Sequence, residues 1–282
     1  MTYVASLDPR TRPLEFSGGT VTLTAKGQRP LLGWYNADGV TFKLDNLPPH
    51  EVVHVVFDLA ILNSWNGSSD IWGPDVWTCE EITTGRKLFS TTFCNNGFFS
   101  NNNAQSFPDA FPIPPGATPH KGWTGAAERQ TLGVRRVFDN ADDAALLIED
   151  CSSVYHLDWT FTHDLPCLEL RFGGKFKAKN KWFGFLDFKA ETVANVSQLT
   201  AEEMLAAWSD LGGDDPVKAS AAVWRLAGAG NAGVSFVAQC LERRPATQAT
   251  ASPYLAGRVD HFLQLADTPI SRALRSKPDA RR

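Results

Sequence analysis

The sequence has no long apolar run of the kind that marks a membrane helix or a secretion signal. No stretch approaches the roughly 18 consecutive apolar residues that a membrane-spanning helix needs. The N-terminus, MTYVASLDPRTRPLEF, also lacks an apolar run of signal-peptide length. We therefore expect no membrane insertion. We expect the chain to be cytoplasmic, or extracellular if its leader is missing or it is a fragment of a larger protein.

Basic residues are not in excess either. The formal net charge is -4, whereas a generic nucleic-acid-binding domain normally shows a basic face. The basic C-terminal segment, RALRSKPDARR, is short and is interpreted as a solvated tail. We expect no nucleic-acid partner.

Cysteine is scarce and is not spaced for a disulfide framework or a zinc site. The five cysteines, an odd number, include no closely spaced pair. Cys79 and Cys94 could bridge a hairpin, but a turn centred on Thr84-Gly85 places Cys79 opposite about position 90. We therefore expect free thiols.

Catalytic and nucleotide-binding motifs are missing as well. Neither GxSxG nor HExxH occurs, and no glycine-rich phosphate loop follows a strand. Several acids and histidines do lie close together in the sequence. We interpret them as surface or packing residues and expect a protein that is not an enzyme; they are Glu80-Glu81, Asp142-Asp143, His156 with Asp158, and His163-Asp164.

Short β-type runs fill the sequence up to about residue 198. Expected strands cover 19–26, 39–47, 51–62, 75–82, 86–93, 153–163, 167–176 and 181–191. The nearly continuous apolar run 51–62 predicts a central strand buried on both faces. NLPPHE (46–51) and TTG (83–85) predict hairpin turns. About nine antiparallel strands predict a mainly β protein, a β-sandwich or jelly roll.

The strand 153–163 shows the clearest alternation of side chains. Tyr155, Leu157, Trp159 and Phe161 share one face, while polar residues such as His156 share the other. Because successive side chains of a strand point to opposite faces, the aromatic face must be the core face.

Helical spacing takes over after residue 198. Thr200 with Glu203 predicts a capping box, and Asp215 with Pro216 predicts the next helix start. The spacing predicts an apolar face on each helix, formed by Met204, Leu205, Trp208 and Leu211 on the first and by Val217, Ala221 and Trp224 on the second. A third helix follows, and one more is plausible from about Tyr254 to Ala266. The expected organisation is a sandwich over 15–190, a helical segment over 198–245 that looks like a HEAT-type pair, and a partly ordered tail over 246–282.

Six pieces of the chain, in order, resemble a jelly-roll β-sandwich module of large bacterial multidomain proteins. They are FKLDNLPPHE (42–51), LNSWNG (62–67), GPDVW (73–77), STTFCN (90–95), VYHLDWTFTH (154–163) and FGFLDF (183–188). The helical part is similar, more weakly, to HEAT-like segments found beside WD-repeat regions. The resemblance implies a non-catalytic, lectin-like or carbohydrate-binding-type sandwich. The chain departs from the module's usual text at Asn66, where an Asp is usual, and after Asp187, where an Asn is lost.

Calcium is one ligand that the acidic and amide residues could hold, because Ca²⁺ prefers carboxylate, amide and backbone oxygens. The tentative ligands are Asn63, Asn66, Asp75 and Asp187. The alternative is that these side chains only hydrogen-bond their own turns.

Aromatic residues in polar loops form the second candidate site. Sugar rings stack on aromatic planes while polar neighbours bind the hydroxyls, as in ligand sites generally. The candidate ligand-binding residues are Trp72, Trp123, Asn66, Asp70, Phe99 and Asn102. Alternatively the indoles fasten the loops from inside, which is the interpretation that we favour for Trp65 and Trp77.

These patterns favour a non-catalytic binding module for glycan or cell-surface ligands. One alternative is a protein-interaction or scaffolding unit whose C-terminal helices bind a partner. The other is a hydrolase on a jelly-roll scaffold, which would place two carboxylates across a cleft.

Overall fold

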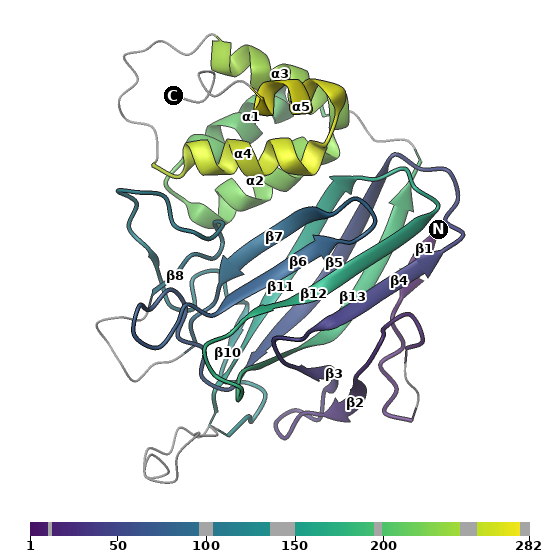
Figure 1. Cartoon of the computed structure of the whole chain (residues 1–282), viewed down its shortest axis with the longest axis vertical. Coiled ribbons are helices and arrows are strands. Elements are labelled where there is room, and N and C mark those ends of the chain that lie inside the picture. Colours follow the sequence, from purple (N-terminus) through teal and green to yellow (C-terminus); the bar gives the residue numbers. More distant parts are fainter. Residues whose placement is uncertain (11–12, 96–103, 136–149, 195–198, 243–252, 277–282) are drawn as a thin grey trace.

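The computed structural model describes residues 1–10, 13–95, 104–135, 150–194, 199–242 and 253–276. They form a mainly β structure of two large antiparallel sheets and a small two-stranded sheet of residues 104–105 and 120–121, with helices beside them (Figure 1). The strands are β1 (Thr2–Val4), β2 (Thr20–Leu23), β3 (Pro30–Tyr35), β4 (Val40–Asp45), β5 (Val52–Leu62), β6 (Val76–Glu81), β7 (Arg86–Thr92), β8 (Ala104–Gln105), β9 (His120–Lys121), β10 (Glu128–Arg129), β11 (Ser152–Thr162), β12 (Cys167–Lys175) and β13 (Trp182–Val193). The helices are α1 (Ala201–Gly212), α2 (Pro216–Gly228), α3 (Gly230–Glu242), α4 (Leu255–Ala266) and α5 (Pro269–Arg275).

The larger sheet has the strand order β10-β11-β5-β13-β3-β2, with β1 added to β13, and the smaller has the order β4-β12-β6-β7. The two sheets pack face to face through aromatic side chains. Trp77 of β6 lies 6.0 Å, ring centre to ring centre, from Trp159 of β11, and Phe57 of β5 lies 5.6 Å from Phe172 of β12. The predicted core face of β11 is confirmed, since Trp159 and its alternate neighbours are buried.

One predicted hairpin is confirmed and the other is wrong. β6 and β7 pair on either side of the TTG turn, and Cys79 faces Phe89, so Cys79 and Cys94 do not form a disulfide. The NLPPHE segment does not close a hairpin, because β4 pairs with β12 while β5 pairs with β11 and β13. Pro48 and Pro49 instead lie in a connection that crosses from one sheet to the other, where no ladder donors are needed.

Strand β5 is central, as predicted, but it is not buried along both faces. His54, Val56 and Asp58 alternate along its outer face and are only half-buried. The side chains of His54 and Asp58 pair with Asp158 and His156 of the neighbouring strand at 2.7 and 2.8 Å. Although the run 51–62 is largely apolar in sequence, one face of β5 is therefore partly exposed and carries charged side chains.

The helix starts are confirmed, whereas the expected apolar faces of α1 and α2 are confirmed only in part, at Leu211 and Trp224. Thr200 caps α1 with the predicted capping box, and Asp215 caps α2. Leu205 and Val217, expected to be buried, are 59% and 48% exposed. The buried face of α2 combines Trp224 and Leu226 with small residues such as Ala219 and Ala222, which allow close packing.

These helices fill the edge of the sandwich beside β7 and β11. The Trp224 ring of α2 stacks on Trp159 at 5.2 Å with the ring planes 16° apart. Gly228 lies so close to β11 that an added Cβ would come within 2.9 Å of Thr160. His261 of α4 contacts the edge strand β7 through the carbonyl of Leu88, at 2.7 Å from Nε2. The sandwich and the helices therefore share one hydrophobic core, an arrangement that lends no support to the HEAT-type interpretation.

The segment expected to be a partly ordered tail contributes to that core. The helix suggested from about Tyr254 to Ala266 is present as α4, and Phe262 and Leu263 are buried. α5, which the sequence did not predict, follows at Pro269. None of the helices described is long and apolar enough to cross a membrane.

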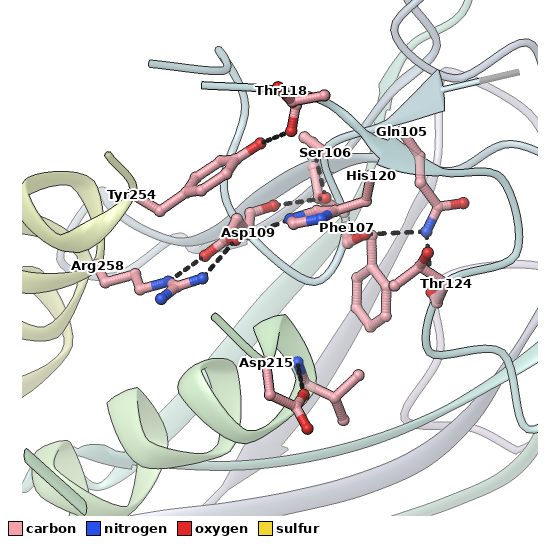
Figure 2. Close-up of polar contacts among 12 residues, drawn as sticks. Gln105, Ser106, Phe107, Asp109, Thr118, His120, Thr124, Asp215, Tyr254 and Arg258 are labelled. Atoms are coloured by element: carbon pink, nitrogen blue, oxygen red, sulfur yellow. Dashed lines mark hydrogen bonds and ion pairs between the residues drawn. The ribbon is translucent and has the colours of Figure 1, made fainter. Parts of the chain in front are cut away.

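A buried ion pair ties α4 to the long insert between β7 and β11 (Figure 2). The Asp109 carboxylate accepts bonds from Nε and Nη2 of Arg258 at 2.7 and 3.0 Å and from Nε2 of His120 at 2.9 Å. Arg258 also donates from Nη1 to the carbonyls of Leu211 and Gly213, which end α1. Burial alone raises the pKa of Asp109, but the bonds from His120 and Arg258 outweigh it and hold that pKa below its ordinary value.

Substituting Trp224 with alanine tests whether the helices complete the sandwich core. Trp224 is 5% exposed and covers Trp159, so we expect a loss of about 3–5 kcal/mol in the free energy of unfolding. Leu205→Ala, at an exposed position of α1, is the control and should change stability by no more than about 0.5 kcal/mol. Chemical denaturation measures both; a Trp224→Ala loss as small as the control's would contradict a shared core.

Candidate functional site

The segment between β5 and β6 covers residues 63–75, and the indoles in it and just after it differ in burial. Trp65 and Trp77, which flank the strands, are fully buried, whereas Trp72 is 58% exposed and Ile71 beside it is 61% exposed. Asp70 is exposed as well. The tip of this segment therefore presents an apolar surface beside a carboxylate to solvent.

Trp65 anchors the start of the segment. Its Nε1 donates to the carbonyls of Leu62 and Trp182 at 3.1 and 3.2 Å, and its ring lies 4.4 Å from that of Phe176. Its backbone N–H donates to Oδ1 of Asn95 at 2.7 Å. A buried indole with its N–H satisfied is a strong fixed point for a loop.

Asp75 anchors the other end through a buried ion pair. Its Oδ2 lies 2.8 Å from Nζ of Lys181 and accepts the backbone N–H of Asn66 at 2.8 Å, while Oδ1 accepts the backbone N–H of Lys177 at 2.9 Å. Lys181 also donates to the carbonyl of Ser64 at 2.7 Å. Both carboxylate oxygens of Asp75 are thus engaged in holding the loop.

Asn66 holds the tip from inside. Its Nδ2 donates to the carbonyl of Trp72 at 3.1 Å, and the Trp72 N–H donates to Oγ of Ser69 at 3.2 Å. The backbone at Trp72 is therefore fixed although its side chain is exposed. Asn66 supports the candidate site through this carbonyl.

The structure brings Trp123 to the same end of the sandwich. Cys94 bridges to Asn66 on one side, and its carbonyl accepts the Trp123 N–H at 3.0 Å on the other. Trp123 is half-buried, and the guanidinium of Arg129 lies 5.8 Å from its ring centre. The guanidinium of Arg129 thus covers one face of this indole, so that face cannot also stack on a sugar. Phe99 and Asn102 lie outside the described residues.

The tentative calcium ligands do not surround one point. Asp187 is exposed on the outer face of the larger sheet and pairs in register with Asp58 of β5. Asn63 lies five residues after Asp58, which at the rise of a strand places it roughly 16 Å from the Asp58–Asp187 pair. Asn63 donates to the carbonyl of Asn180 at 2.6 Å and Asp75 is paired with Lys181, so this set does not fit a calcium ion.

A second candidate site lies at the opposite end of the sandwich, next to the helices. There a cleft of about 610 Å³ is bounded by the start of β5, the β6–β7 turn, the segment after β11, the start of α3 and the α4–α5 junction. Its lining residues are Glu51, Val52, Glu81, Thr84, Arg86, Thr162, His163, Asp164, Leu165, Ala229, Gly230, Asn231, Ala232, Asp267, Thr268 and Arg272. This volume is within the range of small-molecule sites.

Glu81 and Arg86 form the floor of the cleft. Oε2 of Glu81 lies 3.2 Å from Nη2 of Arg86 and accepts the Thr84 hydroxyl, while Oε1 has no partner among the described residues. Arg86 donates to the carbonyls of Thr162 and Leu265 at 2.7 and 3.1 Å, so it joins β11 to the C-terminal end of α4. Burial lowers the pKa of Arg86, and the Glu81 carboxylate opposes that effect. The cleft floor is thus a buried charged pair with one unused acceptor, Oε1 of Glu81, and one unused donor, Nε of Arg86, among the described residues.

Two stacked histidines lie beside the floor. Nδ1 of His50 lies 2.7 Å from the carbonyl of Pro48, and its Nε2 lies 2.7 Å from Nδ1 of His163. Because a carbonyl only accepts, neutral rings assign the proton to Nδ1 of both histidines. Nε2 of His163 then carries a lone pair and has no hydrogen-bond partner within the described residues, with the Cys167 carbonyl nearby but outside bonding geometry.

Residues from the helices form the opposite wall. Asp267, in the left-handed backbone conformation at the end of α4, pairs with Arg272 at 3.0 Å and Arg275 at 2.9 Å. Asn231 and Ala232 line the cleft at the start of α3. No single segment of the chain contains this site.

Sequence reasoning considered three residues of this cleft, Glu81, His163 and Asp164, but only as surface or packing residues and not as members of one site. Glu81 and His163 appeared only as members of adjacent acid and His-Asp pairs, yet they are 0% and 5% exposed at one end of the core. Arg86 drew no attention, although it follows the TTG turn that places it beside Glu81. The alternation of β6 could have assigned Glu81 to the core face, since it shares that face with Trp77 and Cys79.

Comparisons with known proteins add little to this site. No protein-family model matches the chain, and no curated protein matches it. Dimeric latent PorU from Porphyromonas gingivalis is similar with a TM-score of 0.35 and 9% identity over 64% of this chain and 13% of that one. The Agl-KA catalytic domain is similar with a TM-score of 0.30 and 16% identity over 83% of this chain and 32% of that one. The chain thus spans less than a third of either structure, and TM-scores this low carry no argument.

The buried histidine of the cleft predicts how stability depends on pH. Burial lowers the pKa of His163 below its ordinary 6.5, so the unfolded chain takes up the proton first as the pH falls. The free energy of unfolding should therefore be fully present above about pH 6.5 and should decrease as the pH falls toward the folded-state pKa. Chemical denaturation between about pH 7 and 5 measures this slope.

Single histidine substitutions test whether His163 causes this dependence of the free energy of unfolding on pH. His163→Gln should make the loss of stability on acidification smaller than in wild type. His156→Gln, at a side chain that is 58% exposed, should leave the slope unchanged. An identical slope in wild type and His163→Gln would contradict the assignment.

Proposed function

We propose that this chain is a non-catalytic binding module that takes a carbohydrate at the Trp72 end of a jelly-roll sandwich. The observation that carries the proposal is the exposed indole of Trp72, which is 58% exposed on a backbone held at both ends by buried anchors. Leaving a large apolar side chain in water is unfavourable unless something else covers it. A rigid indole also binds at low entropic cost.

The strand order supports the jelly-roll part of the proposal. The eight strands β3 to β7 and β11 to β13 lie as β11-β5-β13-β3 in one sheet and β4-β12-β6-β7 in the other. This alternation of the chain between two four-stranded layers is what two successive Greek keys produce in a jelly roll. Connections of such a sandwich gather at its two ends, where ligands meet loops rather than strands.

The polar neighbours of Trp72 suit a sugar. Asp70 is exposed beside it, and Asn66 is half-buried beneath its carbonyl. An aromatic plane with a few fixed polar groups is the usual composition of small-ligand sites. The helices give less support to a protein-interaction role, because their exposed large apolar residues, Leu205 and Val217, stand singly on different helices.

Binding to immobilised glycans tests the proposal. Wild type should bind at least one glycan class on an array, and Trp72→Ala should lower that affinity by about tenfold or more, since an indole contributes about 1–3 kcal/mol in such contacts. Thermal unfolding should be nearly unchanged, because the side chain is exposed.

Trp34→Ala is the matched control. Trp34 is also an exposed indole, at 43%, but it lies on β3 of the larger sheet and packs on Trp182 of the neighbouring strand β13. Its loss should leave glycan binding unaltered. Glycan binding that survives Trp72→Ala would overturn the proposed site.

A further inference from the structure

Carboxylates in the cleft beside the helices outnumber their basic partners. Glu81 is paired with Arg86, and Asp267 with Arg272. Glu51 and Asp164 are exposed on the sandwich wall, and neither is within salt-bridge distance of a basic side chain in the described part of the chain. The wall therefore presents negative charge toward the cleft. Asp267 has the largest effect in raising the pKa of Arg272, and the charge of Asp164 adds to it.

The floor supplies an independent observation. Glu81 is fully buried and lines the cleft, and its Oε1 has no hydrogen-bond donor among the described residues. A buried acceptor without a donor costs about 1–3 kcal/mol, more if it is charged, so such an atom calls for an explanation. Arg86 does not supply the missing donor. Its Nη2 lies by Oε2, its Nη1 and Nη2 also donate to the carbonyls of Leu265 and Thr162 and to the Thr162 hydroxyl, and its Nε has no acceptor among the described residues.

The cleft also has an apolar side. Leu165 on the sandwich and Ala232 on α3 are half-buried lining residues, and Val52 and Ala229 lie deeper. A ligand that carries a cation on an aliphatic stem can therefore place the stem against these residues and the charged head near the acids. An anion is disfavoured by Glu51 and Asp164.

We propose that this cleft binds an aliphatic ammonium group, from a free amine or from a lysine side chain. The head group lies near Glu51 and Asp164 and donates toward Oε1 of Glu81. The stem packs on Leu165 and Ala232. This site is at the end of the sandwich opposite Trp72, separated from it by the length of β5, which at eleven residues is about 35 Å long.

Calorimetric titration of the full chain with defined probes tests the site. The probes are cadaverine, as the free amine, the peptide N-acetyl-Gly-Lys-Gly-amide, as the side-chain source, and the same peptide with norleucine, as the neutral isostere. We expect one or both amines to bind and the norleucine peptide not to bind. Binding of cadaverine alone assigns a free amine, and binding of the lysine peptide alone assigns a protein partner.

Charge-removing variants locate the binding. Glu51→Gln and Asp164→Asn should each weaken the amine affinity by about twofold to fivefold, the usual effect of an exposed charge pair. Because both side chains are exposed, these variants should fold normally. Glu202→Gln, at an exposed acid in the first turn of α1, is the matched control and should bind like wild type.

Three results would overturn the proposal. They are equal binding of the norleucine peptide, no binding of either amine at millimolar concentration, and wild-type affinity in the Glu51→Gln/Asp164→Asn double variant. Trp72→Ala should leave amine binding unchanged, so failure of the glycan site and failure of this cleft are separate outcomes.

Discussion

The buried ion pair between Asp109 and Arg258 is the contact on which the arrangement of sandwich and helices depends. It joins the insert after β7 to α4, and Arg258 also binds the carbonyls that end α1. Breaking such a pair from one side leaves an uncompensated buried charge, at a cost of about 3–5 kcal/mol. Arg86 fixes the other end of α4 from the sandwich. With α4 held at both ends, α2 is kept against β11, where Trp224 covers Trp159.

This docking makes the two ends of the sandwich different. At one end the loops are fixed by Trp65 and by the Asp75–Lys181 pair, and they leave Trp72 exposed. At the other end the helices create a cleft over Glu81 that neither part has alone. A stable scaffold with rigid loops at its ends suits binding, because little conformational entropy is lost when a ligand is held.

Local signals predicted much of the fold. The alternation through Tyr155 and Trp159 gave the core face of β11, and Thr200 gave the start of α1 through its capping box. The pairing of strands that are distant in the sequence could not be predicted from local patterns. The NLPPHE turn is compatible with a hairpin or a sheet crossing, and only the β4–β12 pairing decides between them. The exposed Trp72 was predictable from its polar setting, whereas the cleft was not, because Glu81, Arg86 and Asp267 meet only after the helices dock.

Two-probe denaturation of Arg258→Met tests most directly whether sandwich and helices form one cooperative unit. Far-UV circular dichroism follows the helices, and the fluorescence of the buried indoles follows the shared core. The account predicts that the two transitions coincide in wild type and shift together, to lower denaturant, in the variant. Loss of the helical signal while the sandwich stays folded, in either protein, would contradict it.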